Sequence, residues 1–196
     1  MNFIYLLGKF LFFIYFKTFN RLTIVGKDNI PVDKGVLLCS NHISNFDPPL
    51  VGVATPRKVR FMAKAELFSN PIMKWLMNAL GTFPVKRGLN DKQALRNGIN
   101  ILNNGEVLGF FPEGTRSKTG KLGSGLAGAG FFALRSDAVV VPCAIVGSYK
   151  PFKKIIIIFG KPVNFKEYSE KMSAKDATAI IMEQISGLLE SSERNI

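Results

Sequence analysis

The sequence predicts a single α/β domain in which a mixed, largely parallel sheet is flanked by helices. Short apolar runs of strand length alternate with stretches of helical length along most of the chain, which is typical of strands joined by crossover helices. The 196 residues suit one domain with a sizeable core and are too few for two. We divide the chain into an N-terminal interfacial helix at residues 1–20 and one domain at residues 21–196.

The N-terminal segment is unusually aromatic. Its unbroken apolar run extends only from Phe10 to Phe16, whereas a membrane-spanning helix needs roughly 20 mostly apolar residues. It also lacks the basic start and the small-residue cleavage site of a signal peptide. We therefore expect a helix that lies in a membrane interface, with Lys9, Lys17 and Arg21 reaching toward the headgroups. The alternative is an apolar helix that packs on the protein's own core. The aromatic residues are Phe3, Tyr5, Phe10, Phe12, Phe13, Tyr15, Phe16 and Phe19.

Continuous apolar runs predict strands that are buried on both faces. One further run, residues 82–87, alternates instead, which places Phe83, Val85 and Arg87 on one face of a half-buried strand. The remaining predicted strands are residues 22–25, 36–40, 59–62, 107–111, 139–145 and 155–159.

The predicted helices are marked by their ends. Pro48 and Pro49 suit the first turn of a helix that runs to about Ala54. Gly81 ends a helix that begins at Pro71. A helix at residues 91–104 is capped by Asn90 or Asp91 and ended by Gly105. A glycine-rich helix runs to about Arg135. The last helix covers residues 173–189, and Ser173 and Asp176 form a capping pair at its start.

The chain is strongly basic. Its 26 Lys and Arg residues and 14 Asp and Glu residues give a formal net charge of +12. A field of this sign favours nucleic acid, an anionic membrane surface or a phosphorylated substrate. The basic residues follow no recognition-helix or aromatic-platform pattern, so we do not expect nucleic acid as a partner. Cys39 and Cys143 both lie in apolar runs, and we expect reduced core thiols of an intracellular protein.

The only histidine, His42, precedes Asp47 by five residues. This spacing separates two side chains by about 140° around a helix, so they can meet only across a turn between a strand and a helix. Because Asp47 precedes Pro48, helical geometry is disfavoured there. A carboxylate bound to one imidazole nitrogen leaves the other free to take a proton. The alternative is that Asp47 caps the next helix and His42 is a satisfied core polar group.

A second polar cluster, residues 111–117, follows a predicted buried strand. Ligand sites in open α/β sheets gather at that end of the strands. Gly114 permits a close backbone approach, and the planar guanidinium of Arg116 suits phosphate oxygens. Glu113 either holds Arg116 in place or accepts a hydrogen bond from a substrate hydroxyl. Arg87 is a cation on an otherwise apolar face, so it needs a substrate phosphate, Glu113 or solvent as its partner. The alternative is an ordinary charged turn.

Two other kinds of site are not expected. With a single histidine and two apolar cysteines, we do not expect a zinc site. Residues 123–128 match G-x-G-x-x-G, but a polar loop precedes them instead of a strand, and no acidic residue lies between Ala138 and Lys166 to bind a ribose. We interpret these glycines as allowing a helix to pack closely.

Taken together, the motifs resemble the glycerophospholipid acyltransferase family, most closely its bacterial 1-acylglycerol-3-phosphate acyltransferases. The resemblance covers roughly residues 20–165 and rests on four blocks in the same order. These are N-H-x-x-x-x-D at Asn41, His42 and Asp47, G-x-F-x-V-x-R at Gly81 to Arg87, F-P-E-G-T-R-S at Phe111 to Ser117, and V-V-P-x-x-I at Val140 to Ile145.

The resemblance implies an activity. His42, oriented by Asp47, deprotonates the sn-2 hydroxyl of lysophosphatidic acid, which attacks the thioester of an acyl-carrier protein or acyl-CoA donor to give phosphatidic acid. No metal or cofactor is implied. The residues that the resemblance assigns to the substrate phosphate are Arg87, Glu113, Gly114, Thr115 and Arg116, with Asn41, Lys118 and Lys121 in support.

Three points stay open after the resemblance. Related enzymes often carry a lysine where this chain has residues 122–125, so either Lys118 or Lys121 takes its place or the donor contact differs. The acceptor is lysophosphatidic acid, glycerol 3-phosphate or another lysophospholipid. A non-catalytic module that binds anionic lipid is the alternative of another class. We expect a peripheral protein on the cytoplasmic face of the cell membrane.

Overall fold

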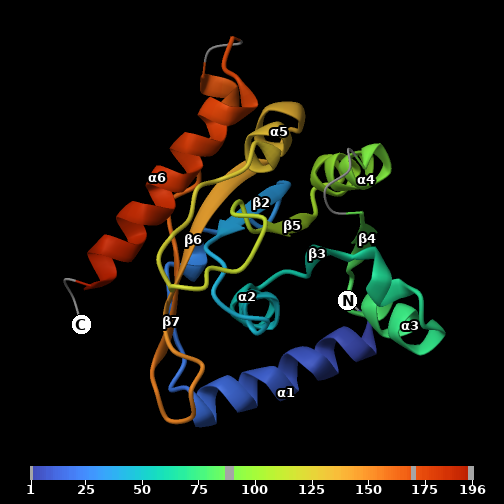
Figure 1. Ribbon diagram of the computed structural model, residues 1–196, viewed down its shortest axis with the longest axis vertical. Helices are drawn as coiled ribbons and strands as arrows, with labels where there is room; N and C mark the ends of the chain where they lie inside the picture. Colours follow the sequence, from blue (N-terminus) through green and yellow to red (C-terminus); the bar gives the residue numbers. More distant parts are fainter. Residues whose placement is uncertain (1, 87–90, 169–170, 194–196) are drawn as a thin grey trace.

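One seven-stranded sheet organises the chain. The computed structural model describes residues 2–86, 91–168 and 171–193 (Figure 1). The strand order is β1-β7-β6-β2-β5-β3-β4, and every neighbouring pair is parallel except β6 and β7. This confirms the predicted mixed, largely parallel sheet. The strands are β1 (Thr23–Val25), β2 (Val36–Ser40), β3 (Val59–Lys64), β4 (Phe83–Val85), β5 (Val107–Phe110), β6 (Val139–Gly147) and β7 (Ile155–Phe159).

Helices cover both faces of the sheet. In Figure 1, α1 and α2 lie on one side of the strands, and α4, α5 and α6 lie on the other. The predicted helices are confirmed to within a few residues, but three short 3₁₀ turns were not predicted. The helices are α1 (Phe3–Phe19), α2 (Asp47–Ala54), α3 (Pro71–Ala79), α4 (Lys92–Asn103), α5 (Gly128–Arg135) and α6 (Ala174–Glu193), and the 3₁₀ turns are η1 (Lys27–Asn29), η2 (Ala65–Phe68) and η3 (Phe165–Glu167).

Strand β2 shows why the apolar runs are continuous. Its Leu38 packs into the core beneath α1 and α2, whereas Leu37 and Cys39 pack into the core beneath α5 and α6. Because successive side chains point to opposite faces, a strand covered on both faces needs apolar residues at every position. Both cysteines are buried and free, and burial raises the pKa of Cys143 to about 12. Such thiols stay protonated and unreactive.

The helix ends follow the local signals in the sequence. The Asp91 carboxylate accepts a hydrogen bond from the Ala94 N–H at 3.0 Å, and the Ser173 hydroxyl accepts one from the Asp176 N–H at 3.2 Å. Gly81, just after α3, has a positive φ of 82°. The predicted caps at Asp91 and Ser173 and the predicted stop at Gly81 are therefore confirmed.

Helix α1 has two different faces. Tyr5 and Phe16 are buried against the domain, so this side packs on the core. Lys9 also lies on this side and donates a hydrogen bond to the Thr55 carbonyl, so the prediction that it reaches toward headgroups was wrong. Within the described ranges, no helix is long and apolar enough to cross a membrane. The outer side exposes Phe3, Leu6, Leu7, Phe10, Leu11, Phe13 and Ile14.

Glycines bring α5 close to its neighbours, as predicted. The Gly130 N–H donates to the Thr178 hydroxyl of α6 at 2.9 Å, and a Cβ at Gly130 would collide with the Ala174 carbonyl. A Cβ at Gly128 would meet the ring of Phe110 on β5. The absent side chains thus set the spacing between α5, α6 and the sheet.

Gly130→Ala should lower the free energy of unfolding by about 1–3 kcal/mol, because backbone atoms of α6 must move to admit the methyl group. Urea denaturation measures this change. The control is Gly187→Ala in α6, where a Cβ meets nothing within 4 Å, and this variant should gain about 0.5–1 kcal/mol. Equal effects in both variants would contradict the packing role of Gly130.

Candidate functional site

Two neighbouring parallel strands place His42 and the loop that begins at Phe111 at one edge of the sheet. Strand β2 ends just before Asn41 and His42, and strand β5 beside it ends just before Phe111. The carboxyl ends of parallel strands form the usual ligand edge of such sheets. A cleft of about 820 Å³ opens there, lined by His42, Ile43, Asn45, Pro48, Phe61, Met62, Lys64, Leu67, Phe111, Thr115, Arg116, Ser117 and Lys118.

His42 and Asp47 meet across the turn between β2 and α2, as the spacing predicts. The His42 Nδ1 and Asp47 Oδ2 atoms are 2.7 Å apart, and the Asp47 side chain is fully buried. Oδ2 also accepts the N–H groups of Ile43 and Ser44, each at 2.7 Å. These donors precede Asp47 in the chain, so its carboxylate binds back into the turn and does not cap α2. The helix-cap alternative is therefore wrong.

The carboxylate fixes which imidazole nitrogen is available. Because Asp47 is an acceptor, the Nδ1 of His42 carries the hydrogen, and Nε2 remains as the nitrogen able to accept a proton. The ring is held flat against Phe111, with 4.1 Å between centroids and 16° between planes. Phe111 in turn stacks on Phe61 at 5.9 Å. The geometry is that of an oriented general base at the floor of a cleft.

Glu113 ties the His42 backbone to the loop of residues 112–125. One carboxylate oxygen accepts the His42 N–H at 2.8 Å, and the other accepts the Gly123 N–H at 2.9 Å. The Ser117 N–H donates to the His42 carbonyl at 2.8 Å, which pins the same residue from its other side. Among the residues that the structure describes, Glu113 forms no ion pair with Arg116. Because both of its carboxylate oxygens bind backbone N–H groups, Glu113 is better suited to hold the loop against His42 than to contact a phosphate.

The remaining residues of this loop differ in exposure and position. Thr115, Arg116 and Lys118 line the cleft, and the Arg116 side chain is exposed, with no hydrogen bond or ion pair to any described residue. Lys121 is exposed and does not line the cleft, so of the two predicted lysines the structure brings only Lys118 to the site. Gly114 adopts a positive φ of 70°, which a glycine allows at low cost. Arg87 lies outside the described residues.

Asn41 extends the sheet where β2 stops. Its side-chain NH₂ donates to the Ile145 carbonyl at 2.9 Å, and its Oδ1 accepts the Ile145 N–H at 2.7 Å. The side-chain amide thus replaces a backbone peptide between β2 and β6. This pairing fixes the point at which the chain turns away into His42, which fits the supporting position predicted for Asn41.

Two residues of the site were missed in the sequence. Lys64, at the end of β3, lines the cleft and adds a third cation to those of Arg116 and Lys118. Tyr149, in the loop after β6, donates its hydroxyl to the Asp47 Oδ1 at 2.7 Å. It lies 102 residues from Asp47 in the chain, and the adjacency of β6 and β2 brings the two residues together.

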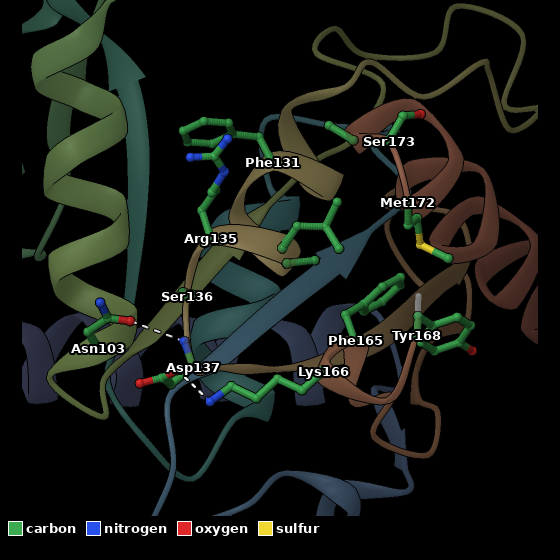
Figure 2. Close-up of a pocket in the computed structure, with 13 residues that line it drawn as sticks. Asn103, Phe131, Arg135, Ser136, Asp137, Phe165, Lys166, Tyr168, Met172 and Ser173 are labelled. Carbon is green, nitrogen blue, oxygen red and sulfur yellow. Dashed lines mark hydrogen bonds and ion pairs between the residues drawn. The ribbon is translucent and has the colours of Figure 1, made fainter. Parts of the chain in front are cut away.

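A second hollow of about 730 Å³ lies at the opposite edge, near the start of β6 (Figure 2). Its exposed Asp137 and Lys166 form an ion pair at 2.6 Å, and Phe165 stacks on Tyr168. It offers no buried acid–base pair. The described part of the chain also contains no cluster of three or more His, Cys, Asp or Glu side chains that could hold a metal. The buried His42–Asp47 pair makes the cleft at the other edge the candidate site.

Comparison with known proteins identifies relatives of the chain. A family model described as Acyltransferase matches residues 21–146. A 1-acyl-sn-glycerol-3-phosphate acyltransferase of Bacillus subtilis (strain 168) is 28% identical, over 88% of this chain and 88% of that protein. The chloroplastic 1-acyl-sn-glycerol-3-phosphate acyltransferase LPAT1 of Arabidopsis thaliana is 34% identical over 67% of this chain, which spans only 38% of the plant protein.

A solved structure shares the fold. The 1-acyl-sn-glycerophosphate acyltransferase PlsC from Thermotoga maritima superposes with a TM-score of 0.76 at 27% sequence identity. The match covers 96% of this chain and 78% of that one. The similarity therefore extends over almost the whole chain.

Proposed function

Because this chain belongs to the acyltransferase family, we propose that it transfers a fatty acyl group from a thioester donor to the sn-2 hydroxyl of 1-acylglycerol 3-phosphate, making phosphatidic acid. One observation carries the proposal. The buried Asp47 binds the Nδ1 of His42 at 2.7 Å, beside a cleft that also contains Arg116 and Lys118. A base and a group of cations in one cleft suit an acceptor that carries both a hydroxyl and a phosphate.

The reaction follows from the state of the imidazole. The His42 Nε2 takes the proton of the acceptor hydroxyl while that oxygen attacks the thioester carbonyl. The new C–O ester bond forms, the C–S bond breaks, and the departing sulfur receives the proton from the imidazolium. Asp47 keeps the hydrogen on Nδ1 and stabilises the imidazolium between these two steps. A module that only binds lipid would have no use for this buried pair.

The acceptor phosphate is assigned to the cations that line the cleft. Arg116 is exposed and without a described partner, so its guanidinium is free to form paired hydrogen bonds to phosphate oxygens. Lys118 and Lys64 add positive charge, and Thr115 adds a hydroxyl. We retain Arg87 as a proposed second phosphate ligand. Glu113 and Gly114 support the loop that presents these groups.

Membrane contact is proposed for α1, with residues 1–20 as the interfacial helix and residues 21–196 as the acyltransferase domain. Helix α3 adjoins its N-terminal end, where the Asn2 side chain donates to the Ala79 carbonyl at 3.0 Å. Ile72 and Trp75 of α3 are exposed, and with the outer side of α1 they form an apolar surface on a basic protein. Such a surface suits an anionic membrane at its cytoplasmic face, from which the lysolipid reaches the cleft.

The donor is an acyl-carrier protein or an acyl-CoA, and the alternative acceptors are glycerol 3-phosphate and another lysophospholipid. Purified protein offered glycerol 3-phosphate and lysophosphatidic acid side by side, with each donor in turn, separates these possibilities by the rate of thiol release. Faster release with lysophosphatidic acid supports the proposal. If thiol is released as fast without any acceptor as with one, the proposal is rejected.

His42→Ala should reduce acyl transfer by about 10³-fold or more, because no other described group in the cleft can take the hydroxyl proton. Asp47→Asn should also lose most activity, because an amide can leave the imidazole in the wrong tautomer. Thiol release measures both variants, and thermal unfolding checks that they fold. Substantial turnover by folded His42→Ala protein would contradict the proposed base.

Arg116→Ala should raise the KM for the phosphate-bearing acceptor by about 10- to 100-fold, because a hydrogen bond to a charged group contributes about 1.5–3 kcal/mol. The KM for the donor should stay unchanged. Steady-state kinetics with each substrate varied in turn gives both values. Arg135→Ala, which removes an exposed arginine near the second hollow, is the charge-matched control. Unchanged acceptor kinetics would refute the phosphate role.

Phe10→Ser combined with Trp75→Ser should weaken binding to vesicles that contain phosphatidylglycerol by at least about tenfold, because two large apolar side chains leave the membrane interface. Vesicle sedimentation measures the partition. Val32→Ser, at an exposed apolar position that belongs to neither α1 nor α3, is the control and should bind as the unmodified protein does. Equal binding by all three proteins would exclude this surface as the membrane contact.

A further inference from the structure

The Asp47 carboxylate is held on both of its oxygens. Its Oδ2 accepts hydrogen bonds from His42 and from two backbone N–H groups of the turn. Its Oδ1 accepts a hydrogen bond from the Tyr149 hydroxyl at 2.7 Å. The three donors on Oδ2 hold only the side of the carboxylate that faces the turn. The Tyr149 hydroxyl supplies the donor for the other oxygen, so a donor on each side opposes rotation of the carboxylate about its bond to Cβ.

Tyr149 is suited to act as a permanent donor. Burial raises the pKa of its phenol well above the ordinary value, and the nearby Asp47 charge and hydrogen bond add to the effect. The phenol therefore keeps its hydrogen wherever the enzyme is folded. The other titratable groups near the pair are Cys143 of β6, whose thiol also stays protonated, and Glu113 of the loop after β5.

The C-terminal end of α1 holds the loop that carries Tyr149. The buried Asn20 donates its side-chain N–H groups to the carbonyls of Ser148 and Lys150, at 3.4 Å and 3.1 Å. These are the residues on either side of Tyr149. The Asn20 carbonyl also accepts the Ile155 N–H at 2.9 Å. One side chain at the end of α1 thus clamps both flanks of the tyrosine.

An aromatic cluster gives a second connection between the same parts. Tyr149 packs on Phe16 of α1, with 6.0 Å between centroids, and on Phe46 at 5.7 Å. Phe46 immediately precedes Asp47 and stacks on Tyr15 of α1 at 5.8 Å. The rings therefore join α1, the turn before Asp47 and the loop after β6.

We propose that Tyr149 is a positioning residue of the acyl transfer, which fixes the Asp47 carboxylate against His42 and is itself seated by Asn20 and the rings of α1. This role rests on the proposed function of His42 as the base. It makes the position of α1 on the domain a determinant of turnover, in addition to any contact of α1 with a membrane.

Tyr149→Phe removes the hydroxyl and keeps the ring. We expect kcat to fall by about tenfold or more while both KM values stay within about twofold, because Tyr149 does not line the cleft at His42. The acid limb of the kcat/KM profile should move to higher pH, because a carboxylate that no longer shares its charge with the phenol stabilises a protonated imidazole more strongly. Tyr168→Phe, at the second hollow, is the control. An unchanged kcat and an unchanged profile would overturn the proposal.

His42 is the only histidine, so ¹⁵N-histidine labelling gives one imidazole spin system without assignment. In the unmodified protein the Nδ1–H tautomer should dominate when the ring is neutral. In Tyr149→Phe the resonances of Nδ1 and its proton should shift, whereas Tyr168→Phe should leave them in place. This measurement needs no substrate. Identical spectra for all three folded proteins would overturn the proposal.

Asn20→Ala tests whether the hydrogen bonds from Asn20 hold the loop that carries Tyr149 in place. Alone it should lower kcat several-fold, but added to Tyr149→Phe it should cause almost no further loss, because Asn20 acts through the hydroxyl that is already absent. If the fall in kcat of the double variant equals the product of the falls in the two single variants, this part of the proposal is overturned. If the unmodified protein releases no thiol with any acceptor, the proposed function fails, whereas the NMR shift still decides whether Tyr149 holds the pair.

Discussion

The site depends on one constraint, which is that the carboxylate of Asp47 is completely removed from solvent. A buried carboxylate is stable only where hydrogen-bond donors replace the water that it has lost. Here the donors come from the turn after β2 and from Tyr149 in the loop after β6. The sheet therefore does more than support the cleft. By placing β6 beside β2, it brings together the donors that a free carboxylate in the interior requires.

The local features of the fold were predictable because their causes are local. The continuous apolar run of β2 reflects burial on both faces, and the spacing of five residues requires His42 and Asp47 to meet across a turn. The expectation that Pro48 keeps Asp47 out of helical geometry was wrong, because α2 begins at Asp47 itself. Tyr149 was not predictable, because its contact with Asp47 depends on which strands are neighbours, and a single sequence does not reveal that order. Lys9 was assigned to the wrong side of α1 for the same reason, since only the packing partners decide which side of an apolar helix faces inward.

Glu113 illustrates a different limit of sequence-based inference. An acidic residue three positions before an arginine invites an ion pair, yet its two oxygens bind the backbone of His42 and of Gly123. Every residue except proline has a backbone N–H group, so a sequence does not show which of these groups will bind a carboxylate. As a result the exposed guanidinium of Arg116 has no partner among the described residues, while the acidic residue of the same motif stabilises the loop. One motif thus contains both the proposed phosphate ligand and the residue that holds its loop in place.

The separation between Asp47 and Tyr149 along the chain has a consequence for biosynthesis. The imidazole and its carboxylate are made within five residues of each other, but the phenol follows 102 residues after the carboxylate. Contacts of such high sequence separation form late, after the intervening strands have closed. A nascent chain that has not yet emerged beyond β6 therefore contains His42 and Asp47 without the hydroxyl of Tyr149. The order of synthesis delays the complete set of hydrogen bonds to Asp47 until nearly the whole sheet is assembled.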